Sequence, residues 1–269
     1  MSGITVQIGD KDLSGGILPT GLDLTVTRYS NHAVGGPYMA EIEAQGSEYA
    51  LWSLVNMLRC PVEIYSAHTV PVWWGYIHEI EIRLKRLTVG VSLSDLYNRV
   101  AVAYSYAKPG EVSVGERRTT AWKQDDESVR EYGIKELLYT TSGSTPDHAL
   151  AARDMLLTQK ARPVQVIEIH ASDQSPGARI TCRGWWETLE WRYYQQSGTA
   201  EIDTAVQAQA IAEECGQFFS LVELDRGLTS GVVVNQFRDG DGTGAYEIEE
   251  LLTMGTARYR RMLAIVDQQ

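Results

Sequence analysis

Cysteine is scarce in this sequence, and its placement argues against two kinds of site. The 269 residues include three cysteines, with no CxxC pair and no histidine at metal-ligand spacing beside them: Cys60, Cys182 and Cys215. An odd number of widely separated cysteines favours reduced, packed thiols in a cytoplasmic setting over a disulfide framework. The sequence therefore predicts neither a disulfide scaffold nor a cysteine-based metal centre.

Positive charge is also in short supply, and long hydrophobic runs are missing. There are 24 Lys and Arg residues against 35 Asp and Glu residues, a formal net charge of -11. Proteins grip nucleic acid by neutralising its phosphates, so the small cluster Arg258 to Arg261 does not make a nucleic-acid site in so acidic a chain. An acidic surface instead suits a conduit that DNA passes without sticking. Met1 is followed by neither a basic stretch nor a long apolar run, so we expect no signal peptide and no membrane span.

Familiar catalytic motifs are absent as well. The chain contains no GxSxG, HExxH, Walker A or GxGxxG pattern. His170 and Asp173 could form an acid/base pair, but no nucleophile motif accompanies them, and a histidine beside a turn is more often a surface or packed residue. A glycosidase pair cannot be chosen among so many carboxylates. We therefore expect this chain not to be an enzyme.

What the chain does have is an alternation of apolar and polar residues. Apolar residues occupy every second position from Ile80 to Leu84 and again from Leu87 to Leu93, and Lys85-Arg86 joins the two runs. This period is typical of an antiparallel hairpin with one wet face. Gly75, at the entry to the hairpin, stands where a side chain would obstruct a bend or a close backbone approach.

The wider pattern predicts an α+β fold that is mostly β. Short alternating runs before the hairpin surround one short helix, for which Ser47 is the expected N-cap and Pro61 the stop. Residues 1–107 are therefore expected to form a first antiparallel β domain, sandwich- or barrel-like, with a packed short helix.

The second half of the chain is expected to repeat this plan after a linker. Residues 108–162 are predicted to form a connecting segment whose helix has Thr145 as N-cap and Pro146 at its first position. Residues 163–269 are predicted to form a second β-rich domain with helices. The segments 91–100 and 180–189 both run from a strand toward aromatic and apolar positions. Internal duplication and chance similarity between two amphipathic strands both remain open as explanations.

Two groups of residues are candidate sites. The segment from Asp239 to Glu250 matches a twelve-residue calcium loop, with these candidate ligands: Asp239, Asp241, Thr243, Glu247 and Glu250. The preceding stretch is strand-like rather than helical, which favours a turn whose Thr243 caps the following helix and whose Glu247 completes a capping box. We therefore expect no cofactor, with calcium as the alternative.

The second group is aromatic. The pairs Trp73-Trp74 and Trp185-Trp186 could serve as a sugar-stacking platform, although alternation places one member of each pair in the core and the other at an interface. These interface candidates are Trp73, Trp74, Tyr76, Trp185 and Trp186.

Three stretches resemble proteins of the tail tip of long-tailed bacteriophages, in particular the baseplate-hub family. The first stretch is the helix expected after Ser47, followed by Leu58 to Tyr65 and by Trp74-Gly-Tyr-Ile. The second is the segment Asp126 to Gly133 with the Ala-rich helix after it. The third is the helix 205–214 together with the distal segment 248–255. The resemblance covers most of the chain, through packing residues rather than a diagnostic motif.

This resemblance implies a ring-forming structural protein of the virion tail, made in the bacterial host cytoplasm. Hubs of the family have two tail-tube-like domains per subunit, so that a trimer meets the hexameric tube above. The partners implied are further copies of the chain, the tail tube, distal tail and tip or fibre proteins, and DNA in transient passage. Such hubs usually continue beyond this length, so a distal tail protein, which forms a hexameric ring, is a close alternative. A tail-associated carbohydrate-binding or cell-wall-degrading module is the rival from another class.

Overall fold

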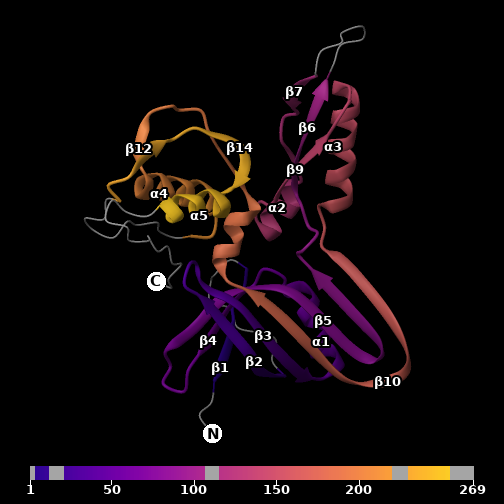
Figure 1. Cartoon of the computed structure of the whole chain (residues 1–269). Helices are drawn as coiled ribbons and strands as arrows, with labels where there is room; N and C mark the ends of the chain where they lie inside the picture. Colours follow the sequence, from indigo (N-terminus) through magenta and orange to yellow (C-terminus); the bar gives the residue numbers. More distant parts are fainter. Residues whose placement is uncertain (1–3, 12–20, 107–114, 220–229, 255–269) are drawn as a thin grey trace. The chain divides into compact units, whose positions relative to one another are not determined.

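The computed structural model describes residues 4–11, 21–106, 115–219 and 230–254, and these fold into two compact units (Figure 1). Unit 1 draws on residues 1–94 and 165–269, and unit 2 on residues 95–164. This division differs from the expected one into 1–107, 108–162 and 163–269. The reason is strand β10 (Val164–Arg183), which returns after unit 2 and pairs with strand β3 (Gly36–Gly46) from the first part of the chain.

Unit 1 is built on a six-stranded sheet with the order β1-β4-β5-β10-β3-β2. The pairs β1/β4, β4/β5, β10/β3 and β2/β3 are antiparallel. The prediction of an α+β fold that is mostly β, with antiparallel sheets, is confirmed. The remaining strands of this sheet are β1 (Thr5–Ile8), β2 (Leu22–His32), β4 (Pro61–Tyr65) and β5 (Pro71–Ser92).

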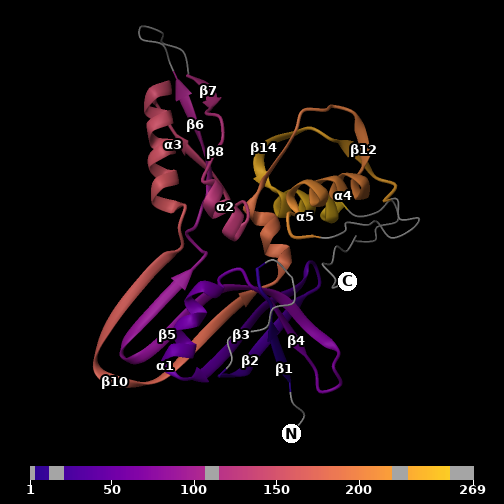
Figure 2. The same ribbon diagram turned by 180° about the vertical axis from the view of Figure 1, so that it is seen from behind.

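The two edge strands of this sheet, β1 and β2, also approach each other, so the sheet curls toward a barrel (Figures 1 and 2). Helix α1 (Glu48–Ser53) packs against β3 and β5 and continues into the 3₁₀ turn η1 (Leu54–Met57). The predicted N-cap is confirmed, because the Ser47 hydroxyl oxygen accepts a hydrogen bond from the Ala50 N–H at 3.2 Å.

Strand β5 is a hairpin that turns at Lys85. This residue has a φ of 51°, the left-handed conformation that tight hairpin turns require. The Leu93 N–H donates to the His78 carbonyl at 3.0 Å and joins the two halves. Ile80 and Ile82 are fully buried, so the hairpin and its buried face agree with the alternation in the sequence.

Strand β10 runs around the outside of this hairpin (Figures 1 and 2). It follows the returning half of β5, reverses near the hairpin turn and follows the outgoing half. Three side-chain contacts mark this path, at 2.9, 2.9 and 2.8 Å: Thr88 with His170, Arg86 with Asp173, and Glu81 with Arg179. We call residues 78–93 of β5 and 165–179 of β10 the arm.

The C-terminal part of unit 1 is a small helical layer. The 3₁₀ helix η2 (Trp185–Trp191) packs with helices α4 (Thr204–Cys215) and α5 (Gly244–Met254). Their apolar core includes Leu189 and Ile211. Two antiparallel ribbons, β11/β14 and β12/β13, flank the helices. Their strands are β11 (Tyr193–Gln196), β12 (Glu201–Asp203), β13 (Val233–Asn235) and β14 (Arg238–Thr243).

Unit 2 is centred on strand β6 (Arg99–Tyr106), which pairs antiparallel with β7 (Glu116–Thr119) and β8 (Lys123–Gln124) and parallel with β9 (Glu136–Thr141). Helix α2 (Asp126–Tyr132) precedes β9, and helix α3 (Pro146–Lys160) packs on β6. Thr145 caps α3 by accepting a hydrogen bond from the His148 N–H at 3.3 Å, as predicted. Residues 95–106 therefore belong with this unit and not with the sheet of unit 1.

The two segments compared for duplication take different structures. Residues 91–100 end β5 and then enter β6 of unit 2, whereas residues 180–189 end β10 and enter the 3₁₀ helix η2. The similarity in sequence does not extend to the structure after the strand. Among the described residues, no helix is both long and apolar enough to cross a membrane.

Candidate functional site

The five aromatic interface candidates do not share one surface. Trp73 and Tyr76 are fully buried, so in this structure neither is available to a partner, and their assignment as interface residues is corrected. Trp74, Trp185 and Trp186 are half-buried. The alternation explains Trp73 and Trp74, since neighbouring residues on a strand face opposite sides. It does not explain Tyr76, which is buried by a distant part of the chain.

That distant part is an aromatic cluster contributed by η2 and by Phe218, which follows α4. The ring of Tyr76 lies 5.1 Å from Trp185 and 5.5 Å from Trp191, measured between centroids. Phe218 contacts both tryptophans, at 5.3 and 6.0 Å. Burial, with a smaller effect of Glu187, raises the pKa of Tyr76 well above its ordinary value. This cluster is a core that attaches η2 to the sheet.

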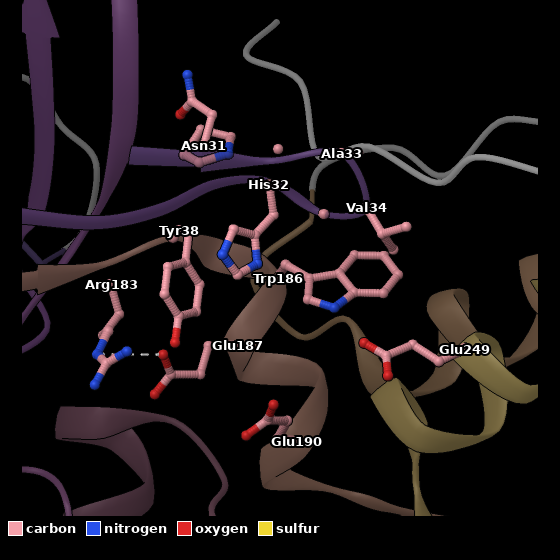
Figure 3. A pocket seen from close by; sticks show the side chains of 14 residues that line it. Asn31, His32, Ala33, Val34, Tyr38, Arg183, Trp186, Glu187, Glu190 and Glu249 are labelled. Carbon is pink, nitrogen blue, oxygen red and sulfur yellow. Dashed lines mark ion pairs between the residues drawn. The ribbon is translucent and has the colours of Figure 1, made fainter. Parts of the chain in front are cut away.

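Trp186, the next residue on η2, lines a pocket of about 760 Å³ (Figure 3). Residues 31–38, which are the turn between β2 and β3 with the adjoining ends of both strands, form one side of the pocket. The end of β10 and η2 form another side, and Glu249 of α5 completes it. These segments are far apart in the sequence. We call this cavity the acidic pocket.

One side of the acidic pocket is aromatic and closely packed. His32 stacks on Tyr38 with a centroid distance of 3.8 Å and an interplanar angle of 14°. Gly35 has a φ of 84°, and a Cβ there would lie 2.5 Å from the Trp186 side chain. A glycine is therefore required for the turn to lie over the indole.

The other side carries four charges. The Arg183 guanidinium lies 5.6 Å from the Tyr38 ring centroid and 3.4 Å from a Glu187 carboxylate oxygen. Burial alone lowers the pKa of Arg183, but Glu187 and Tyr38 outweigh it, and the net shift is upward. Glu190 and Glu249 also line the pocket and are exposed. Three carboxylates beside one guanidinium make a pocket that favours a positively charged group.

The segment proposed as a calcium loop is not folded as one. Asp239, Asp241 and Thr243 lie on strand β14, while Glu247 pairs with Arg238 at 2.5 Å. Within the described ranges, no group of three or more His, Cys, Asp or Glu side chains could hold a metal ion. The alternative, a turn whose Thr243 caps the following helix, is supported: the Thr243 hydroxyl oxygen accepts a hydrogen bond from the Tyr246 N–H at 3.4 Å. The ion pair with Arg238 gives the Glu247 carboxylate another role than the expected capping box.

The remaining sequence candidates have structural partners. His170 and Asp173 bond with Thr88 and Arg86 of the arm. The three cysteines are buried, as expected, and none of them forms a disulfide bond. Burial raises the pKa of Cys60 and of Cys182. The basic cluster 258–261 lies outside the described residues.

The sequence predicts a strand from Val164 to His170, but sequence reasoning missed that the apolar side chains of this first half of β10 are exposed. Val166, Ile167 and Ile169 are 51%, 64% and 83% exposed. Strand β3 pairs only with residues 178–183 of β10, so in the described part of the chain one edge of residues 165–171 has no strand beside it. The sequence does contain a sign of this exposure. Val166 and Ile167 are adjacent apolar residues, so they face opposite sides of the strand, whereas a half-buried strand alternates apolar and polar residues.

No family model, no curated protein and no solved structure matches this chain. Its function therefore has to be inferred from its own residues.

Proposed function

We propose that this chain is a ring-forming structural subunit of a bacteriophage tail tip, a baseplate hub that continues or closes the tail tube and lets DNA pass. The observation that carries the proposal is the arm, which presents an apolar strand, with Ile167 and Ile169 exposed, along an unpaired edge. An edge of this kind is a liability in a monomer and suits pairing with another chain.

The edge lacks the features that keep edge strands from pairing. Residues 164–171 contain no proline and no lysine, and Glu168 is the only acidic residue among them. Exposed apolar strands commonly mark interaction sites. If each subunit joins the next through the same strand contact, the subunits form a closed ring when the rotation from one subunit to the next adds up to a full turn.

The curled sheet with α1 packed on it supports a tail-tube-like architecture for unit 1. The described residues contain one such sheet per chain, whereas the hub arrangement calls for two. This observation favours the second candidate, a distal tail protein that forms a ring of six copies. The net charge of -11 fits either ring, because an acidic lumen does not retain DNA.

The rival reading is a carbohydrate-binding or cell-wall-degrading tail module. Burial of Trp73 weighs against a stacking platform made from the Trp73-Trp74 pair, since a sugar needs an open aromatic face. Trp74, Trp185 and Trp186, all half-buried, are the residues left for such a role.

The mass of the purified protein in solution, followed by electron-microscope class averages, tests the proposal. A ring with a central channel supports it, and three or six copies distinguish hub from distal ring. A particle without a channel at all concentrations, together with glycan binding that is lost in Trp74→Ala, would replace the proposal with the rival.

A further inference from the structure

The acidic pocket combines the two features that recognise a planar cation. Its carboxylates, from Glu187, Glu190 and Glu249, outnumber its one guanidinium, from Arg183. Its opposite side holds the flat rings of His32 and Trp186 (Figure 3). Arginine side chains stack on aromatic faces and form paired hydrogen bonds with carboxylates, so one arginine can use both features.

We propose that the acidic pocket binds the guanidinium group of an arginine presented by a partner polypeptide. The guanidinium lies against the aromatic side and faces the carboxylates of Glu190 and Glu249. The guanidinium of Arg183, which also lines the pocket, is held by Glu187 and Tyr38. This inference does not depend on the proposed assembly.

The size and chemistry of the pocket favour this ligand over others. A volume of about 760 Å³ exceeds that of one side chain, so the backbone on either side of the arginine also fits. An anion would face three carboxylates. A metal ion would need a cluster of ligands, and the described residues form none.

The pocket is also rigidly built, which lowers the cost of binding. A Cβ on Gly184 would lie 1.7 Å from the Pro37 carbonyl oxygen, so the turn is held directly against the end of β10. The Gly184 N–H donates to the Tyr38 carbonyl at 2.8 Å. A preformed site loses less conformational entropy when its ligand binds.

Titration of the full chain with N-acetyl-arginine amide, followed by calorimetry and tryptophan fluorescence, tests the proposal. N-acetyl-citrulline amide, which has nearly the same shape without the charge, is the matched control ligand. We expect the arginine compound to bind at least about ten-fold more tightly than the citrulline compound. The uncharged citrulline side chain can form neither charge-assisted hydrogen bonds nor a cation–π interaction. Equal binding of the two compounds, or no binding of either, would overturn the proposal.

A pair of variants locates the site. The double substitution Glu190→Gln and Glu249→Gln is expected to weaken binding at least about five-fold, from the usual strength of exposed ion pairs. Glu250→Gln removes one carboxylate from the next position on α5, where Glu250 lines a different pocket, and is expected to leave binding unchanged. An equal loss in Glu250→Gln and in the single variant Glu249→Gln would mean general charge attraction and would refute the site. Unchanged near-ultraviolet circular dichroism establishes that each variant is folded.

Discussion

Arg238 and Glu247 form an ion pair within the C-terminal part of unit 1, with 2.5 Å between Nε and Oε2 and with both side chains largely buried. The guanidinium also donates to the backbone carbonyls of Asn235 and Phe237. Even so, burial raises the pKa of Glu247, and the attraction of Arg238 only partly offsets it. The Glu247 carboxylate is thus costly to bury, and the charge of Arg238 is what compensates most directly for that cost.

Arg238→Ala is expected to reduce the free energy of unfolding by about 2–4 kcal/mol at neutral pH, because it leaves the Glu247 carboxylate buried without its counter-charge. A carboxyl with a raised folded-state pKa favours the folded state at low pH and loses that contribution as pH rises through the folded-state pKa. The deficit of Arg238→Ala should therefore be smaller at pH 5 than at pH 8 in urea denaturation. The double variant Arg238→Met with Glu247→Leu should be more stable than Arg238→Ala. A deficit independent of pH would contradict this account.

Gly75 and Gly90 lie in the same strand but have different space around them. A Cβ on Gly75 would lie 2.1 Å from the Arg183 carbonyl oxygen, whereas at Gly90 the nearest atoms, from Val166, are at 3.9 and 4.0 Å. Gly75→Ala should cost about 2–4 kcal/mol of stability through backbone displacement. Gly90→Ala should change stability by less than about 1 kcal/mol. Thermal and chemical denaturation of both variants provides the comparison, and equal losses would show that the close approach at Gly75 is not what limits substitution.

Asp203 is the N-cap of α4 and accepts hydrogen bonds from Ala205, Ser230 and Gly231. Although burial opposes its charge, these bonds hold the pKa of Asp203 below its ordinary value. Its contribution to stability is then complete above the unfolded-state pKa and is lost as pH falls through the folded-state pKa. Asp203→Asn should cost about 1–2 kcal/mol at pH 7, and the difference from the original chain should narrow below about pH 4. A difference that stays constant down to pH 3 would be the contrary result.

Ile169 and Tyr49 are both strongly exposed apolar side chains, at 83% and 87%, but only Ile169 lies on the unpaired edge of the arm. Ile169→Lys is expected to leave the stability of the subunit within about 0.5 kcal/mol, because the side chain is exposed. It should raise the concentration needed for assembly at least about ten-fold. Tyr49→Lys, on α1, serves as the control and should assemble normally. Sedimentation at several concentrations measures both, and a normal assembly of Ile169→Lys would remove the arm from the interface.

Local sequence determined much of the secondary structure. The alternation from Ile80 to Leu93 specified a hairpin with one buried face, since a period of two places every second side chain on the same side. Ser47 and Thr145 were identifiable as N-caps because their side-chain oxygens satisfy N–H groups within the next three residues. The requirement for glycine at Gly75 could also be inferred from the sequence. Its cause, the close approach of the Arg183 carbonyl oxygen, could not.

Only the tertiary structure decided how these elements combine. Strand β10 crosses from one half of the chain into a sheet made by the other, and this pairing joined segments that the sequence assigned to separate domains. The same folding buried Tyr76 under η2 and turned Glu247 toward Arg238 instead of a calcium ion. It also assembled the acidic pocket from three distant segments. Spacing along the chain reports neighbours within a turn or a strand, whereas these contacts depend on which sheet edge and which helix face meet after folding.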